Sequence, residues 1–401
     1  MKFLFDNESF SFEALRAAAF AKYDGAELGE VIATAAHITD GDEDSWLTAW
    51  QATAERVEKH AETAAAAGHR VSAREAYLRA SNYFRTAEFF RREDPDHDEL
   101  AQTISARQRD TFVKAIALFD TPVEQIRIPY EGTTLPGYLY LVDGSGTPRP
   151  TVIYNNGYDS TAEESYFAIA AAALRRGYNV LAFDGPGTGA ALRVQGLRLR
   201  PDWEAVITPV VDYALTRPEI DAHNISLFGY SLGGYLTARA AAFEHRLSAL
   251  ILDDGLFDFS SSHRSAMPPF VLDWVFDGRD DIANPVLRLA MQMSTQSRWG
   301  LNNGRWTMGV DSPADVIRCM RQYSLEGVVE QIDTPTLVLD AADDHFFKGQ
   351  PEIVYQRLRA PKTHVVLSNA EEGAGEHCHA GASSRVHSVI FDWLDGIKPR
   401  N

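Results

Sequence analysis

The stretch FGYSLGGYL, residues 228–236, joins an apolar run to a helical run and holds Ser231 at the junction. NISLFGY (224–230) predicts a buried strand, and the alanine-rich run after the junction predicts a helix. Gly229 and Gly233 complete the spacing G-x-S-x-G, in which small residues two places before and after the serine let strand and helix approach. Such a sharp turn projects the serine hydroxyl outward and favours a nucleophile. A tightly packed turn with only a structural role is the alternative.

Short apolar runs alternate with helical runs on both sides of this stretch. Alternation of this kind predicts an α/β fold, with a mostly parallel, doubly wound sheet covered by helices on both faces. Two strands around a turn at Glu131-Gly132 come first. The helix after the next strand is expected to open at Ser160, with Glu163 in capping-box spacing. The further strands are expected in TVIYNNG (151–157), YNVLAFD (178–184), LSALILDDG (247–255), TPTLVLDAADD (334–344) and THVVLSNAEEG (363–373).

Residues 1–121 predict a separate helical domain before this core. In residues 44–69, apolar side chains recur at spacings of three and four, which is typical of an amphipathic helix. A later aromatic stripe predicts packing between helices, with some of its rings facing a ligand as the alternative. The stripe consists of Tyr77, Tyr83, Phe84, Phe89 and Phe90.

Residues 257–331 interrupt the alternation with a segment rich in aromatic residues, Pro and Met. The segment is too long for a plain connection between two strands. We interpret it as a helical lid over a site, with an extra helical subdomain or an oligomer contact as alternatives. The α/β core then comprises residues 122–256 and 332–401.

Composition narrows the classes of function. The chain has 401 residues and a net charge of −18, which argues against nucleic acid or an anionic membrane as its partner. Cys319 and Cys378 are its two cysteines, too few for a disulfide framework, and a reducing compartment fits them best. MKFLFDNESF lacks the apolar core of a signal peptide, and no run is apolar enough to span a membrane. We therefore expect a cytoplasmic protein.

A serine nucleophile needs a base, and the base needs an orienting acid. On a sheet of this kind the chain order is serine, acid, histidine. TPTLVLDAADDHFF (334–347) supplies Asp344 at the loop position after a late strand, with Asp343 as the alternative. His377, after a glycine-rich loop that follows the last strand, is the expected base. His379 is expected near the start of the final helix.

The same two segments contain side chains that bind metals. The suitable ligand types are Asp344, His345, His377, Cys378 and His379. Their spacing matches no common closed zinc site, so we expect no metal.

The loop NNGYDSTAEES (155–165) follows the strand expected beside the one that ends at the serine. Gly157 lets its backbone come close, and the N–H of Tyr158 is the expected partner of the Leu232 N–H in an oxyanion hole. Asp159 would then lie near the nucleophile, as an assisting residue or as a carboxylate that caps a turn or helix.

Seven motifs spread over nearly the whole chain resemble the α/β-hydrolase superfamily, in particular a branch with an all-helical N-terminal domain. That branch includes the 2,6-dihydroxypseudooxynicotine hydrolase and the fungal naphthopyrone chain-shortening hydrolases. The motifs are YLRASNYFRTAEFF (77–90), NGYDSTAEES (156–165), FDGPGTG (183–189), GYSLGGYL (229–236), TPTLVLDAADDHFF (334–347), GAGEHC (373–378) and FDWLD (391–395).

The resemblance implies a triad of Ser231, Asp344 and His377, no cofactor, and a pocket between the helical domain and the core. It also implies a homodimer. An assisting carboxylate after the oxyanion loop has its counterpart in Asp159, and Gly157 and Tyr230 are assigned with it to substrate binding or assistance.

These observations predict a serine hydrolase that acts on an aromatic or extended apolar small molecule. The scissile bond is a C–C bond next to a ketone, or an ester. An esterase, thioesterase or peptidase, or a biosynthetic acyl transferase or cyclase, is the alternative, because one triad serves all these reactions. A binding protein without catalytic activity is disfavoured by the presence of serine, acid and histidine.

Overall fold

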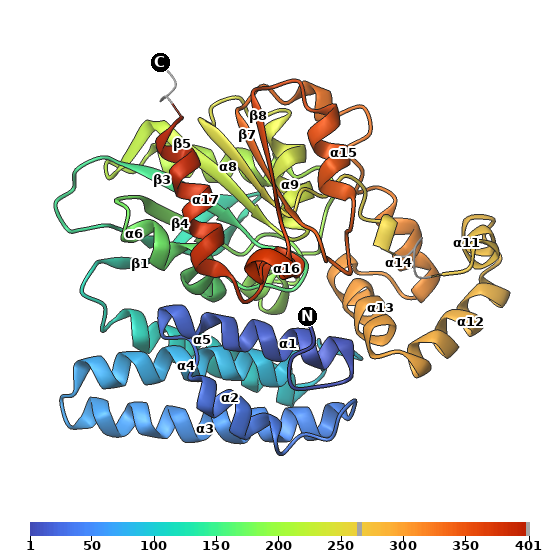
Figure 1. Cartoon of the computed structure of the whole chain (residues 1–401), viewed down its shortest axis with the longest axis horizontal. Helices are drawn as coiled ribbons and strands as arrows, with labels where there is room; N and C mark the ends of the chain where they lie inside the picture. Colours follow the sequence, from blue (N-terminus) through green and yellow to red (C-terminus); the bar gives the residue numbers. More distant parts are fainter. Residues whose placement is uncertain (263–266, 398–401) are drawn as a thin grey trace.

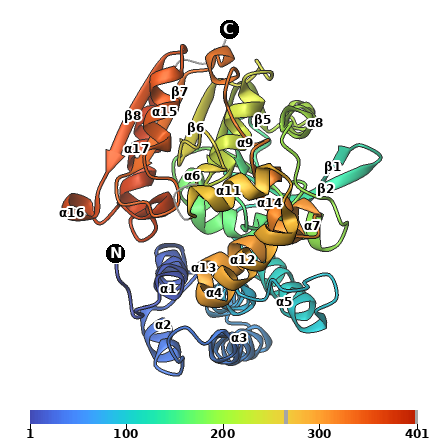
Figure 2. The same cartoon turned by 90° about the vertical axis from the view of Figure 1, so that its right-hand side faces the viewer.

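The computed structural model describes residues 1–262 and 267–397. The N-terminal helices lie along one end of a twisted sheet whose faces carry further helices, as Figure 1 shows. A group of helices from the middle of the chain lies beside the sheet and the N-terminal helices, and Figure 2 places it in front of both.

The N-terminal helices form because amphipathic runs begin at good capping residues. Side-chain oxygens of Asn7, Asp42 and Asp98 accept hydrogen bonds from the first-turn N–H groups of three of these helices. Trp46 and Trp50 are fully buried where these helices pack on each other. The elements are α1 (Glu8–Ala19), η1 (Phe20–Tyr23), α2 (Leu28–Ala35), α3 (Glu43–Ala66), α4 (Arg70–Glu88) and α5 (Glu99–Ile116).

Within the described residues, eight strands form one sheet in the order β1-β2-β4-β3-β5-β6-β7-β8. β2 runs antiparallel to both of its neighbours, and the other pairs are parallel. The predicted mostly parallel sheet is confirmed. The strands are β1 (Val123–Tyr130), β2 (Thr133–Tyr140), β3 (Arg149–Asn155), β4 (Asn179–Phe183), β5 (Ile220–Tyr230), β6 (Ala249–Asp253), β7 (Thr336–Ala341) and β8 (Lys362–Leu367).

Successive side chains of the central strands enter different layers, which explains why the strands are continuous apolar runs. Val152 packs in the layer that continues into the N-terminal helices, whereas Ile153 packs in the opposite layer. The first layer includes α6 (Ala171–Leu174) and α17 (Ser383–Asp395). The second includes α8 (Glu204–Leu215), α9 (Gly233–Ala241) and α15 (Gln350–Arg357).

The helix after β3 begins one residue later than expected. Thr161 and Glu164 form the capping box, because the Ser160 hydroxyl instead accepts a hydrogen bond from Arg16 and Glu163 accepts one from Tyr138. The helical run is also irregular. It passes through η2 (Ala162–Glu164) and η3 (Tyr166–Ala170) before α6.

The segment between β6 and β7 is helical in its described part. Its helices are α11 (Pro269–Phe276), α12 (Asp280–Met293), α13 (Thr295–Met308) and α14 (Pro313–Met320), and the short η4 (Val329–Gln331) precedes β7. Trp299 of α13 stacks on Phe89, with ring centroids 4.7 Å apart, and its Nε1 donates to the Phe89 carbonyl. The insertion therefore packs directly on the N-terminal helices. None of the helices in residues 1–262 and 267–397 is long and apolar enough to cross a membrane.

Candidate active site

The carboxyl ends of the parallel strands meet at one edge of the sheet, and the loops that leave them carry the site. β3 leads to Asp159, β5 to Ser231, β6 to Asp254 and β7 to Asp344. His377 begins η5 (His377–His379), which follows β8 and the short α16 (Asn369–Glu372). Ligands bind at this edge in open α/β sheets.

Ser231 occupies a strained turn between β5 and α9. Its φ of 60° lies in the left-handed region that a residue with a side chain seldom adopts. The two positions that flank the turn, 229 and 233, must be glycine because any side chain there would clash with the backbone. A Cβ on Gly229 would lie 2.2 Å from the Gly233 carbonyl oxygen, and one on Gly233 would lie 2.7 Å from the Asn155 carbonyl oxygen.

Ser231, His377 and Asp344 form a chain of hydrogen bonds. The Nε2 atom of His377 lies 2.8 Å from Ser231 Oγ, and its Nδ1 atom lies 2.9 Å from Asp344 Oδ2. Asp343 points elsewhere and accepts the Asn369 N–H. Of the two acids that the sequence left open, the structure therefore brings Asp344 to the histidine.

His379 does not lie near the start of the final helix, so that expectation was wrong. The chain turns at Gly381, whose φ is 93°, and α17 begins at Ser383. His379 is buried in η5 instead, and its Nδ1 atom bonds the Ala374 carbonyl oxygen.

A second carboxylate that the sequence analysis did not single out also reaches His377. Asp254 Oδ2 lies 2.9 Å from His377 Nδ1 and accepts the N–H of Cys378 at 3.1 Å. Burial opposes protonation of the imidazole, but the carboxylates of Asp344 and Asp254 beside it raise the pKa of His377 above its ordinary value. The two carboxylates therefore stabilise the imidazolium that forms when the ring takes up a proton.

The loop after β3 passes very close to Ser231. A Cβ on Gly157 would lie 2.9 Å from Ser231 Cβ, so this position has room only for glycine. Asp184 anchors the loop by accepting from Asn156 Nδ2 and the Ala162 N–H. Within the described chain, the N–H groups of Tyr158 and Leu232 have no main-chain acceptor.

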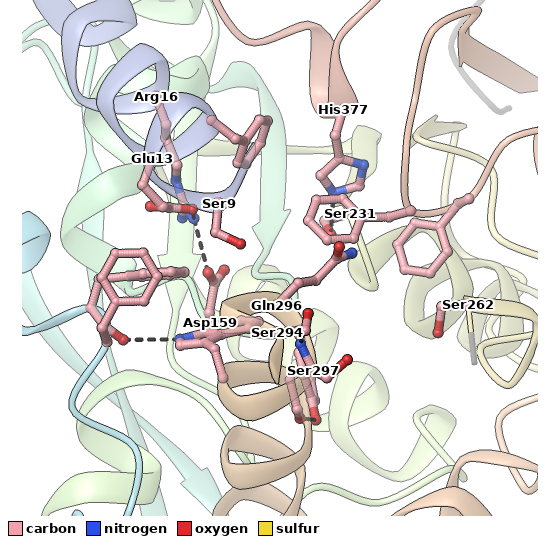
Figure 3. A pocket seen from close by; sticks show the side chains of 18 of the residues that line it. Ser9, Glu13, Arg16, Asp159, Ser231, Ser262, Ser294, Gln296, Ser297 and His377 are labelled. Atoms are coloured by element: carbon pink, nitrogen blue, oxygen red, sulfur yellow. Dashed lines mark hydrogen bonds and ion pairs between the residues drawn. The ribbon is translucent and has the colours of Figure 1, made fainter. Parts of the chain in front are cut away.

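Asp159 belongs to a buried charge cluster that joins the helical domain to the core. Its Oδ2 atom accepts from Arg16 at 2.9 Å and from Arg85 at 3.4 Å, and Figure 3 shows the contact with Arg16. Arg16 also bonds Glu164, and Arg85 bonds Glu13. Burial alone would raise the pKa of Asp159, but the two guanidinium groups outweigh burial and lower it. Burial raises the pKa of Glu13 despite the same two arginines.

The Asp159 side chain faces a cavity of about 510 Å³ that Ser231 and His377 also line. Its walls come from the helical domain, the core loops and the insertion. Tyr230 lines it as well, and Phe89 and Phe90 of the aromatic stripe face it while Tyr83 and Phe84 are buried between helices. Most of the wall is apolar, through Phe12, Phe89, Phe259, Trp299, Phe346 and Phe347. Figure 3 shows Ser294, Gln296 and Ser297 on the insertion side.

Two groups of three potential metal ligands lie near the histidine in the part of the chain that the structure describes. They are Asp254, His377 and Cys378, and Asp253, Asp254 and His379. These sets differ from the one that the sequence suggested, because Asp344 and His345 belong to neither. Both ring nitrogens of His377 are already engaged, by Ser231 and Asp344.

Sequence reasoning missed Asp254 and the three charged residues Glu13, Arg16 and Arg85. Asp253 and Asp254 do end an apolar run, but only the order of the strands in the sheet places Asp254 beside His377. Nothing in the sequence pattern indicated a role at the site for Glu13, Arg16 or Arg85. They lie on amphipathic helices, where a charge normally faces water.

The protein is a hydrolase of the α/β-hydrolase type. Its sheet, the serine at the turn between β5 and α9 and its similarity to known hydrolases all support this class. The chain belongs to the FrsA-like esterase family, whose model, described as esterase FrsA-like, matches residues 35–302. The predicted resemblance to the α/β-hydrolase superfamily is confirmed.

Curated relatives match almost end to end. The 20-hydroxy-prefusarin hydrolase FUS2 of Gibberella moniliformis is 40% identical, over 98% of this chain and 97% of its own length. Hydrolase LUC6 of a Fusarium species is 39% identical, with the same coverage. Among solved structures, the 2,6-dihydroxy-pseudo-oxynicotine hydrolase superposes with a TM-score of 0.74 and 24% identity over 95% of each chain, a likeness of fold.

Proposed function

We propose that this hydrolase uses Ser231 as its nucleophile, with His377 as the base and Asp344 as the orienting acid. The observation that carries the proposal is the unbroken chain of hydrogen bonds from Ser231 Oγ to His377 and on to Asp344. Ser231, whose φ is 60°, lines a largely apolar cavity and is therefore accessible to a small organic substrate.

The reaction begins when Ser231 Oγ attacks a substrate carbonyl carbon and its proton passes to His377 Nε2. The electron pair of the carbonyl moves to its oxygen, which the N–H groups of Leu232 and Tyr158 stabilise. The carbonyl then re-forms as the bond to the leaving group breaks, and His377 returns its proton to that group. Water, deprotonated by His377, finally releases the acyl group from Ser231.

The bond cleaved is a C–C bond next to a ketone. The leaving group is then a carbanion, which a β-carbonyl or an aryl ketone delocalises as an enolate. The relative FUS2 is named as a hydrolase of 20-hydroxy-prefusarin, which supports hydrolysis of a small organic molecule as the class of reaction.

Asp159 serves the substrate as a hydrogen-bond acceptor. Its lowered pKa keeps it ionised, which makes it a poor proton donor for a carbanion. Arg16 and Arg85 both bond Oδ2, and Oδ1 makes no hydrogen bond among the described residues. Asp159 therefore accepts a hydrogen bond from a substrate hydroxyl at the charged end of an otherwise apolar cavity.

A matched assay tests the proposal. Purified wild type and Ser231→Ala are given an aryl β-diketone and a p-nitrophenyl ester. Cleavage of the diketone that is lost in Ser231→Ala is the expected result. Ester turnover without diketone cleavage would instead assign an esterase or an acyl transferase, the second candidate, which the apolar cavity and the same triad also suit.

A further inference from the structure

The structure places two carboxylates, not one, at the Nδ1 atom of His377. Asp344 comes from the loop after β7 and Asp254 from the end of the neighbouring strand β6. Each has an Oδ2 atom 2.9 Å from Nδ1, and the hydrogen bond itself goes to Asp344. We propose that Asp254 is a second positioning acid of the same triad, which stabilises the imidazolium together with Asp344.

Main-chain groups hold both carboxylates in place. Asp344 Oδ1 accepts the Phe346 N–H at 2.7 Å, and Asp254 Oδ2 accepts the Cys378 N–H at 3.1 Å. The side chains of Asp254 and Asp344 are 1% and 3% exposed, so little water screens them from the ring. Neither carboxylate has to move when His377 takes the proton from Ser231.

The arrangement is unfavourable before the reaction and favourable during it. Before the reaction two buried carboxyl groups crowd one ring nitrogen, and Asp254 Oδ1 is buried without a hydrogen-bond partner among the described residues. Once the proton reaches Nε2, the imidazolium attracts both. Asp254 therefore lowers the barrier through a ground state that is itself destabilised, as is common at active sites.

This inference rests on the proposed function, and the rate of labelling by a fluorophosphonate tests it without knowledge of the substrate. In a triad that has a single acid, replacing that acid by Asn lowers the catalytic rate about 10⁴-fold. With two acids we expect Asp344→Asn and Asp254→Asn to lose only about 10- to 100-fold each, and the double variant to lose about 10⁴-fold. Failure of Ser231 itself would be seen separately, as labelling that persists in Ser231→Ala.

Two further readouts separate positioning from a merely structural role. Asp254→Asn should unfold at the same or a higher temperature than wild type while it is labelled more slowly. The acidic limb of its labelling rate should also move to lower pH, because one carboxylate no longer favours the imidazolium. The other titratable groups around His377 and Asp254 are unchanged in this variant and comprise Asp253, Asp344, His345, Cys378 and His379.

The proposal is overturned if Asp254→Asn is labelled at the wild-type rate with an unmoved acidic limb. It is equally overturned if Asp344→Asn alone loses the full 10⁴-fold or so that a single acid supplies. The second result decides the matter even if Asp254→Asn does not fold.

Discussion

At the level of single residues, the site depends on glycines at positions where a side chain would not fit. Gly157 is the clearest case, because a Cβ there would lie 2.8 Å from the Tyr230 carbonyl oxygen and 2.9 Å from Ser231 Cβ. Neither the Tyr230 backbone on one side nor Ser231 on the other can shift at a small cost in free energy. The loop that carries the proposed oxyanion donor would have to move.

Gly157→Ala should therefore lower the labelling rate at Ser231 at least about 10-fold, since losing one oxyanion donor costs about 10²–10³ in rate. Gly29→Ala is the matched control, because Gly29 lies in α2 with nothing within 4 Å of its Cβ position. That control should keep full activity and gain up to about 1 kcal/mol in stability. Equal activity of the two variants would show that the close approach has no function.

The proposed role of Asp159 can be tested with two substrates, because only a substrate with a hydroxyl group can donate a hydrogen bond to its carboxylate. Asp159→Asn removes the charge that accepts the proposed substrate hydrogen bond, and bonds to charged groups contribute about 1.5–3 kcal/mol. We expect kcat/KM to fall about 10- to 100-fold for a hydroxylated aryl ketone and much less for the same ketone without its hydroxyl. A loss of equal size on both ketones would assign Asp159 a structural role.

At the scale of elements, the five charges Glu13, Arg16, Arg85, Asp159 and Glu164 hold α1 and α4 against the loop after β3. Arg85 is 5% exposed and contacts three of the carboxylates. Its removal would leave Arg16 as the one remaining cation of the cluster beside three buried carboxylates, and breaking a buried pair costs about 3–5 kcal/mol.

Arg85→Met should accordingly lose about 3–5 kcal/mol in the free energy of unfolding measured with urea. Arg107→Met is its counterpart in the same domain, because Arg107 pairs with Glu55 and Glu58 where its side chain is 33% exposed to water, and its loss should stay within about 1 kcal/mol. Similar losses in both variants would mean that the buried cluster adds nothing beyond an ordinary surface pair.

The elements themselves were largely predictable from the sequence, because a strand buried on both faces reads as a continuous apolar run. The strand before Ser231 and the helix after it follow from the motif alone. Helix starts were less certain, since Ser160 and Thr161 both make good caps and tertiary contacts with Arg16 decided between them. Asp254 went unnoticed because only the order of strands in the sheet brings its loop beside His377.

At the scale of the whole molecule, the buried His387 links the end of the core to the helical domain. Its Nδ1 atom lies 2.8 Å from the Tyr23 hydroxyl, and its Nε2 atom donates to the Ala168 carbonyl oxygen. Burial lowers the pKa of His387 to about 4. The unfolded chain, with an ordinary pKa of about 6.5, binds the proton first as the pH falls.

Stability from His387 is therefore fully present above about pH 6.5 and is lost as the pH falls toward 4, by about 1.4 kcal/mol for each pH unit. His387→Gln should show a shallower fall in unfolding free energy between pH 6.5 and 4.5 than wild type. His223→Gln, at an exposed position, should keep the wild-type slope. Identical slopes in all three proteins would mean that His387 is not the group responsible.

The central claim is that Ser231 is a nucleophile activated by His377, and covalent labelling tests it most directly. A fluorophosphonate is reacted with wild type, Ser231→Ala and, as a control from the same cavity, Ser297→Ala, and the adduct is located by peptide mass spectrometry. We predict one adduct, on the peptide containing Ser231, in wild type and in Ser297→Ala, and none in Ser231→Ala. An unlabelled wild type, or an adduct that survives in Ser231→Ala, would contradict the account.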